Sequence, residues 1–233
     1  MLLFRTKTTF IPSLAVALAA TVTSAVGEPP NDPKLKAPPR KIVWNRQNEA
    51  MVEVTKIDDT VFYELRYATD RNFVGKQIYP RLSRCLLRKS VAFRLKRAQT
   101  ELRKKGYGLK IWDAYRPAWA QQTLWDYSPN PEFVGAPARG GSYHTWGVAV
   151  DVTLVDLAGR EQRMPTDFDD FTPAAKSEYT GGDPVIAANV RLLRSAMLAA
   201  GFTGLRDEWW HFTAEDAAYF CPVDMPLEAG GKY

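Results

Sequence analysis

The two histidines of this 233-residue chain each lie beside residues that could help to hold a metal ion. His144 is followed seven residues later by Asp151, and His211 closes the segment Glu208-Trp-Trp-His211. Two imidazoles, one carboxylate and a water molecule make a standard catalytic zinc site. Glu208 lies three residues before a candidate ligand, where it could act as a general base. These residue types predict a hydrolytic metal centre with His144, Asp151 and His211 as ligands.

Asp151 interrupts an apolar run that extends from Val148 to Leu154 and predicts a largely buried strand. Burying an unpaired carboxylate is unfavourable, so this side chain needs a metal ion or another cation beside it. A turn at Gly147 would let His144 and Asp151 converge on one ion. Two alternatives stay open, namely an Asp151 paired with a buried arginine and a His211 that is an ordinary core histidine.

The segment around His211 has the residue types of a strand, predicted over residues 208–212. Side chains alternate along a strand, which would place Glu208 and His211 on opposite faces. A twist or a bulge at the strand end would bring both to the same ion. Trp209 and Trp210 would then provide an apolar wall, which raises the pKa of a nearby carboxylate.

The composition fits a packed domain and argues against several classes of protein. Apolar residues make up 45% of the chain and charged residues 24%, so a core can form and disorder is not indicated. The net charge of +5 is too weak a bias, without a basic stripe carrying interleaved aromatics, to predict nucleic-acid binding. The two cysteines, Cys85 and Cys221, could form a disulfide in an oxidising compartment, and their spacing does not decide this.

The N-terminal residues predict export. Residues 1–27 resemble a secretory signal, with Arg5 and Lys7 ahead of an apolar stretch and small residues at the expected cleavage point. The apolar stretch is short for a membrane span, although an uncleaved anchor is an alternative. A proline-rich leader follows at 28–41, and residues 42–233 would form the catalytic domain. We therefore expect a periplasmic or secreted protein without membrane contact after cleavage.

Helices and strands alternate irregularly along the domain, which favours an α+β class over a doubly wound parallel sheet. The long segment 128–143 is rich in Pro, Gly and Ser and predicts a loop. A short final helix is expected to begin at Thr213. The sequence predicts helices at 90–105, 117–127 and 183–201 and strands at 61–67, 109–112, 148–154 and 208–212.

Four segments together resemble one family of enzymes. They occur in the order Arg66-Tyr-Ala-Thr-Asp-Arg-Asn-Phe-Val-Gly-Lys, Asp113-Ala-Tyr-Arg-Pro, Ser142-Tyr-His-Thr-Trp-Gly-Val-Ala-Val-Asp and Glu208-Trp-Trp-His. The order and spacing resemble the zinc D-alanyl-D-alanine dipeptidases, the VanX-like family, across residues 58–212. The resemblance implies a single domain in which helices flank a small, mostly antiparallel sheet, the zinc D,D-peptidase or hedgehog-like fold.

The resemblance also implies a role for each matching residue. Glu208 corresponds to the base that activates the attacking water, and Arg116 to the arginine that stabilises the developing oxyanion. Arg116 could instead brace the loop before the following proline. Ser142 and Asp169 correspond to positions that hold the amino terminus of the dipeptide, with Asp167 and Asp170 as neighbouring alternatives to Asp169. The zinc ligands, one ion per chain, correspond to His144, Asp151 and His211.

The expected activity is zinc-dependent hydrolysis of free D-Ala-D-Ala in cell-wall metabolism. A zinc D,D-carboxypeptidase or endopeptidase acting on peptidoglycan stems is the second hypothesis, because those relatives share the metal motif but typically have proline where this chain has Trp209. A noncatalytic wall-binding module is the third. Export makes a role in antibiotic resistance doubtful, and Tyr143 and Trp146 could reshape the pocket for another D-amino acid. The sequence does not decide the oligomeric state.

Overall fold

The central feature of the fold is a five-stranded sheet in a computed structural model that describes residue 46 and residues 48–229. Its strand order is β2-β4-β5-β7-β6, and within the described residues only the β2–β4 pair is parallel. A separate antiparallel ladder joins β1 to β3. The strands are β1 (Met51–Glu53), β2 (Phe62–Tyr63), β3 (Leu86–Arg88), β4 (Tyr107–Asp113), β5 (Ala149–Asp156), β6 (Phe202–Gly204) and β7 (His211–Ala214).

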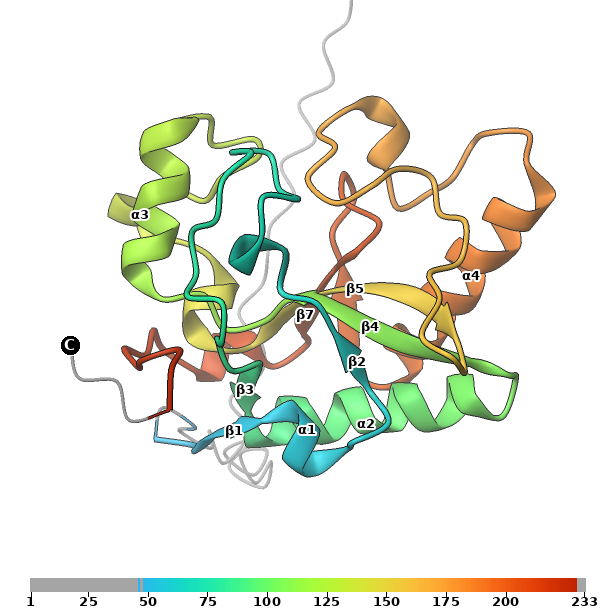
Figure 1. Cartoon of the computed structure of the whole chain (residues 1–233), viewed down its shortest axis with the longest axis horizontal. Helices are drawn as coiled ribbons and strands as arrows, with labels where there is room; N and C mark the ends of the chain where they lie inside the picture. The colour runs from blue at the N-terminus through green and yellow to red at the C-terminus, as the bar shows by residue number, and fades with distance from the viewer. Residues whose placement is uncertain (1–45, 47, 230–233) are drawn as a thin grey trace, which may run out of the picture. The chain divides into compact units, whose positions relative to one another are not determined.

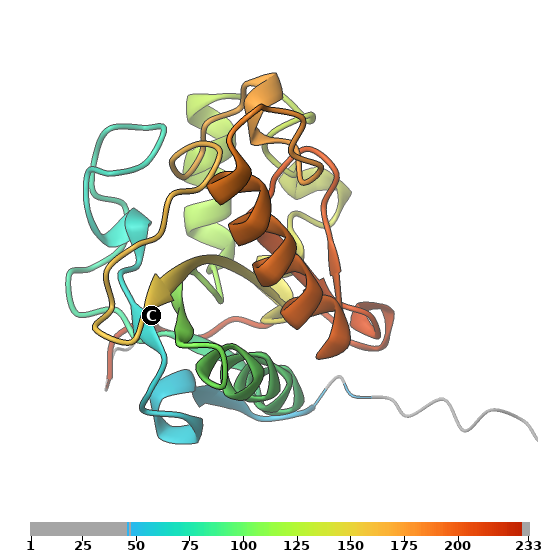
Figure 2. The same cartoon turned by 90° about the vertical axis from the view of Figure 1, so that its right-hand side faces the viewer.

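Helices flank this sheet, as the α+β prediction requires. Helix α2 packs against β4 and α4, and α4 also contacts β6 and β5. Figure 1 shows α2 on one side of the sheet, with α3 and the long connecting loops on the other, and Figure 2 shows α2 and α4 next to each other. The predicted class, with a small and mostly antiparallel sheet, is confirmed. The helices are α1 (Val54–Ile57), α2 (Lys89–Arg103), α3 (Ala118–Tyr127) and α4 (Pro184–Ala199).

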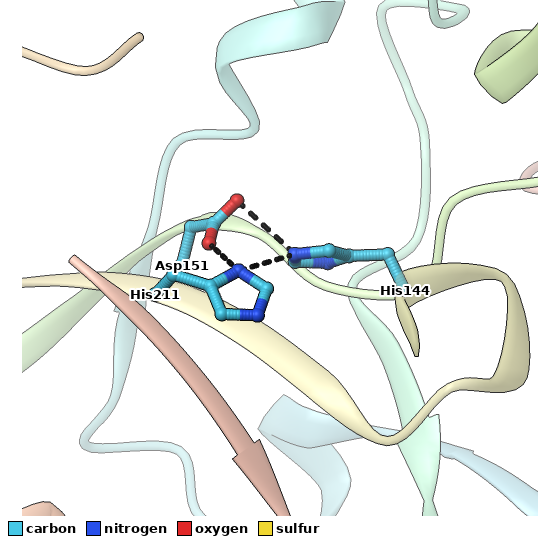
Figure 3. Close-up of side chains that lie close together, drawn as sticks. All are labelled: His144, Asp151 and His211. Carbon is cyan, nitrogen blue, oxygen red and sulfur yellow. Dashed lines mark hydrogen bonds and ion pairs between the residues drawn. The ribbon is translucent and has the colours of Figure 1, made fainter. Parts of the chain in front are cut away.

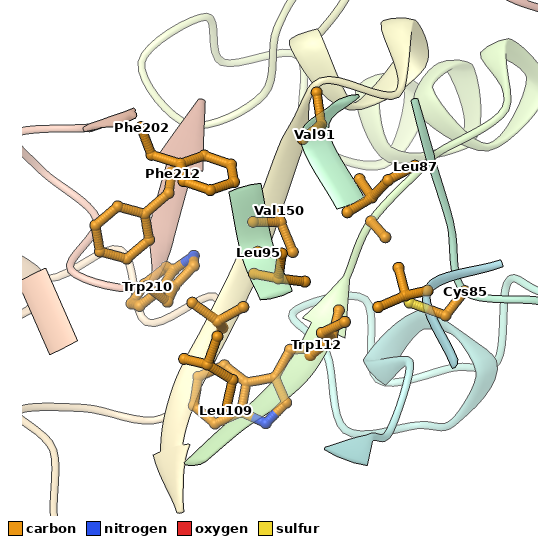
Figure 4. Packing of buried hydrophobic residues seen from close by; sticks show 14 of the residues in the cluster. Cys85, Leu87, Val91, Leu95, Leu109, Trp112, Val150, Phe202, Trp210 and Phe212 are labelled. Carbon is orange, nitrogen blue, oxygen red and sulfur yellow. The ribbon is translucent and has the colours of Figure 1, made fainter. Parts of the chain in front are cut away.

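Strand β5 is the most deeply buried strand of the sheet, since every residue but its last is buried. Figure 4 shows part of the apolar cluster around it, where Val150 of β5 lies among side chains of α2, including Leu95, and near Trp210 and Phe212. Removing apolar surface from water contributes roughly 25 cal/mol per Å². This packing holds β5 in place, and Asp151 is carried on it.

The longer predicted helices and strands are confirmed. Helix α2 begins and ends within two residues of the predicted bounds. Strand β4 extends the prediction by two residues at its start and one at its end, and β5 begins one residue later and ends two residues later than predicted. The predicted cap of α4 is also present, because the Asp183 carboxylate accepts hydrogen bonds from the backbone N–H groups of Val185 and Ile186. These groups have no partner within the helix, which is why an acidic cap is favourable.

Three local predictions were wrong. The strand predicted over 61–67 is only Phe62–Tyr63, and the chain then turns into a 3-10 helix at Arg66–Ala68. Arg66 and Tyr67 are both buried, and a strand would have pointed one of these neighbours outward. The last predicted strand begins at His211, not at residue 208, and the final helix is a 3-10 turn at 217–219.

The short elements β1, α1, β3 and β6 were not predicted. Each has three or four residues, too few to show a hydrophobic period. The predicted signal peptide and leader lie outside the described residues, so their boundaries stay predictions. Over the described residues, no helix has the length and apolar character needed to cross a membrane. Cys85 is buried, Cys221 is partly exposed, and both are free thiols.

Gly147 joins the 3-10 helix that carries His144 to strand β5, and its φ of +70° lies in the left-handed region. A Cβ at this position would lie 2.6 Å from Cε of Met51. We expect Gly147→Ala to lower the free energy of unfolding by about 1–2 kcal/mol, mainly through backbone strain. Denaturant unfolding measures this difference. Gly182→Ala is the matched control, because a Cβ there meets nothing within 4 Å, and an equal loss in both variants would contradict the explanation.

Candidate metal centre and peptidase site

Three side chains from two segments about sixty residues apart converge at the end of the central sheet. Asp151 of β5 pairs in register with His211 of β7, and His144 comes from the 3-10 helix just before β5. Nδ1 of His211 lies 3.0 Å from Oδ1 of Asp151 and 3.2 Å from Nε2 of His144. Nε2 of His144 lies 3.3 Å from Oδ2 of Asp151. Figure 3 shows the three groups pointing toward a common point.

These separations fit a tetrahedral metal ion. Ligand bonds of about 2.0–2.1 Å in a tetrahedral zinc site separate neighbouring ligand atoms by about 3.3 Å. The outer hydrogen bonds also fit. Nδ1 of His144 donates to the carbonyl oxygen of Ala114 at 2.7 Å, and Nε2 of His211 lies 3.0 Å from Oγ1 of Thr213. A carbonyl oxygen only accepts, so it fixes the His144 tautomer with Nε2 free to bind a metal. The Thr213 hydroxyl can accept from Nε2 of His211 in the same way, which would leave Nδ1 free.

The site therefore brings together one imidazole nitrogen from each histidine and one carboxylate. All three can act as lone-pair donors to a metal ion. Burial by itself raises the pKa of Asp151, but His144 and His211 outweigh it and hold that pKa far below its usual range. The alternative of a buried arginine partner is weaker, because Nη2 of Arg116 is 3.9 Å from Oδ2, farther than either imidazole. Two imidazoles with a carboxylate suit zinc among the common divalent ions.

Glu208 approaches the same centre from a turn and not from a strand. The N–H of His211 bonds the carbonyl oxygen of Glu208, closing a turn that brings both side chains to one side. Oε2 of Glu208 lies 3.8 Å from Nδ1 of His211. Burial, with Trp210 lining the same cavity, raises the pKa of Glu208 to about 7, although His211 opposes the shift. A carboxylate with that pKa can both accept and release a proton near neutrality.

Arg116 is held firmly at the cavity wall. Its Nε and Nη2 donate to Oδ2 of Asp113 at 3.0 and 2.8 Å, and its Nη1 donates to Oε1 of Gln121 at 2.9 Å. The guanidinium carbon lies 4.9 Å from the centre of the Tyr67 ring. Arg116 therefore braces the segment before Pro117, as the structural alternative supposed, and it also presents a fixed positive charge to the cavity.

Two residues of this network, Asp113 and Tyr67, belong to the sequence motifs, but no role was assigned to them from the sequence. Asp113 is fully buried, accepts a hydrogen bond from the Tyr79 hydroxyl at 2.9 Å and pairs with Arg116. The bulge of β4 sets Asp113 opposite Asp151. Tyr67 lies between Arg116 and Asp169. An arginine next to a buried strand requires a carboxylate partner, and this requirement could be read from the sequence. The sequence does not show which carboxylate is the partner.

Ser142 and Asp169 both line the cavity, whereas Asp167 and Asp170 do not. Oδ1 of Asp169 accepts from the Tyr67 hydroxyl at 3.3 Å, and Oδ2 accepts from the backbone N–H of Phe73 at 3.4 Å. Its φ of 56° is left-handed, a conformation that aspartate tolerates better than most residues. Burial and then the charge of Asp151 raise the pKa of Asp169 well above its usual range, although Arg116 opposes this.

The cavity that contains these groups has a volume of about 570 Å³. Besides the polar residues it is lined by aromatic rings and by residues of β6 and β7. Tyr143, next to His144, lines it as well, and its ring packs edge-on against Trp146 at 5.2 Å. All seven residues predicted for the site border this one cavity, namely Arg116, Ser142, His144, Asp151, Asp169, Glu208 and His211.

An α+β fold with a largely buried His-Asp-His set, a neighbouring carboxylate and a fixed arginine defines a hydrolase of the metallopeptidase type. The comparison with protein families agrees with this class. Residues 47–226 match the Peptidase_M15 family, described as D-ala-D-ala dipeptidase, and the chain belongs to that family.

Relatives of known name support this membership. The D-alanyl-D-alanine dipeptidase of Escherichia coli (strain K12) is 35% identical over 170 residues, which cover 73% of this chain and 87% of that protein. The dipeptidase of the same name from Enterococcus faecalis is 34% identical, covering 68% and 88% of the two chains. The one from Streptomyces coelicolor is 31% identical, covering 70% and 90%. Among solved structures, VanYB in complex with D-Alanine-D-Alanine matches at a TM-score of 0.38 with 18% identity, over 58% of this chain and 80% of that one.

Proposed function

We propose that this chain is a zinc-dependent D-alanyl-D-alanine dipeptidase. The observation that carries the proposal is the convergence of His144, Asp151 and His211 within 4.8 Å, with Glu208 beside them, in a member of a dipeptidase family. A bound zinc ion would polarise the scissile carbonyl and lower the pKa of a water molecule toward about 7.

The residues around the ion perform the proton and charge steps. Glu208 takes a proton from the attacking water and delivers it to the amine that leaves when the amide bond breaks. Oε2 of Glu208 lies 3.8 Å from Nδ1 of His211, beside the proposed metal ligands, and its raised pKa of about 7 suits both steps. Arg116 faces the negative charge that develops on the carbonyl oxygen, and its bonds to Asp113 and Gln121 hold it there before reaction.

Asp169 and Ser142 bind the amino terminus of the dipeptide. The dipeptide carries a free ammonium, and Asp169 is a partly buried carboxylate in the same cavity as the metal ligands. An ammonium placed there would offset the unfavourable burial of Asp169. An acylated peptide stem has no ammonium at that position, so this contact favours the free dipeptide over a longer stem.

We also propose that the mature protein acts outside the inner membrane, in the periplasm or secreted. The motivation is the charged, apolar and small-residue order of residues 1–27. The measurement is the N-terminal sequence of the protein recovered from fractionated cells. A start near residue 28 in an exported fraction is expected, and a cytoplasmic protein that begins at Met1 would overturn the proposal.

The first test is substrate choice by the purified, zinc-loaded chain. We expect hydrolysis of free D-Ala-D-Ala and at least about 100-fold lower kcat/KM for an N-acylated stem peptide that ends in D-Ala-D-Ala, because a site that pairs a substrate charge rejects analogues without it. Release of D-alanine measures both reactions. Cleavage of the stem but not of the free dipeptide would move the protein to the carboxypeptidases or endopeptidases.

The second test separates metal binding from catalysis. Glu208→Ala is expected to lower kcat by about 10²–10⁴-fold while zinc stays bound, because Glu208 moves protons and is not a ligand. His144→Ala should lose both zinc and activity, since it removes one of three ligands. Metal content after dialysis and dipeptide turnover give the two readouts. Full activity in the Glu208 variant would contradict the mechanism, and a wall-binding module would retain its binding unchanged.

A further inference from the structure

Three phenylalanine rings from three separate loops form one wall of the cavity. Phe171 packs edge-on against Phe73, with ring centres 5.3 Å apart, and stacks on Phe133 at 4.6 Å. The planes of Phe133 and Phe171 differ by only 16°. Tyr127 extends the group outward, at 5.6 Å from Phe73. We call Phe73, Phe133 and Phe171 the aromatic wall, and all three border the cavity.

The aromatic wall is partly uncovered. The Phe133 side chain is 38% exposed to solvent, and Phe73 and Phe171 are half-buried. Two buried aliphatic side chains, Leu124 and Val134, line the same cavity. When an apolar group of a ligand covers apolar surface in a cavity, the removal of both surfaces from water favours binding. The methyl side chain of D-alanine is too small to cover the apolar surface of three rings and two aliphatic side chains.

The position of the aromatic wall relative to the polar groups identifies which part of a dipeptide it meets. Phe73 donates its backbone N–H to Oδ2 of Asp169, and Phe171 follows Asp169 by two residues. The ammonium and the first side chain of a dipeptide branch from the same carbon atom. When the ammonium is at Asp169 and the scissile carbonyl is at the metal ligands, the first side chain branches off close to Asp169, the residue that Phe73 bonds and that Phe171 follows in the same cavity.

We propose that the aromatic wall is a subsite for a large apolar side chain on the first residue of the dipeptide, so that this enzyme prefers substrates such as D-Leu-D-Ala over D-Ala-D-Ala. The proposal rests on the proposed dipeptidase function and on Asp169 as the ammonium partner. The second residue lies beyond the scissile bond, away from Asp169, so the same preference does not extend to it.

The experiment compares kcat/KM for D-Ala-D-Ala, D-Leu-D-Ala and D-Ala-D-Leu with the zinc-loaded mature chain. One added methylene in an apolar pocket changes specificity by about 10–200-fold. We expect D-Leu-D-Ala to exceed D-Ala-D-Ala by at least about 10-fold, and D-Ala-D-Leu to show no gain. Equal or lower kcat/KM for D-Leu-D-Ala, with D-Ala-D-Ala still cleaved, overturns the subsite alone. If none of the free dipeptides is cleaved, the proposed function fails and the subsite falls with it.

Variants locate the preference on the rings. Phe171→Ala and Phe133→Ala should each lower the ratio of kcat/KM for D-Leu-D-Ala over D-Ala-D-Ala by at least about 5-fold, as expected for lost apolar contact. Phe133 is the more exposed ring, so its variant keeps the test valid if the Phe171 variant does not fold. Phe93→Ala is the matched control, because this exposed ring lies on α2 and does not border the cavity. An unchanged ratio in the Phe133 variant, or an equal change in the Phe93 variant, overturns the proposal.

Discussion

The arrangement of the site depends on one constraint, the pairing of Asp151 with His211 on neighbouring strands of the central sheet. This pairing places a carboxylate against an imidazole, and the turn at Gly147 adds the second imidazole from His144. Each of these three groups can offer a lone pair to a metal ion, and the sheet and the turn hold them close together. The apolar packing of β5 stabilises the arrangement, and together the three groups could hold a metal ion.

The charges around this centre form one connected network. Asp113 lies opposite Asp151 on the next strand and binds Arg116, which packs on Tyr67. The Tyr67 hydroxyl donates to Asp169, which also borders the cavity. Each charged group is therefore oriented by a neighbour before any substrate arrives. Preorganised charges stabilise a transition state more effectively than groups that must reorient, which is the physical basis for a hydrolytic site here.

The cavity combines this charged network with apolar walls. Trp210 borders it near Glu208, where burial raises the pKa of that carboxylate to about 7, and Phe171 borders it near Asp169. Low polarity strengthens every electrostatic interaction in the site, so the apolar residues contribute to chemistry as well as to packing. The same residues also give the cavity its shape.

Local sequence determined the features that depend on near neighbours. The period of α2, the Asp183 cap of α4, the buried strand around Asp151 and the residue types of the metal centre could all be predicted. Tertiary structure decided the rest, including the turn that brings Glu208 to His211 and the position of Asp169, but not of its acidic neighbours, at the cavity. It also set the register between strands about sixty residues apart. These outcomes depend on contacts between distant segments, and local patterns carry no information about which distant groups will meet.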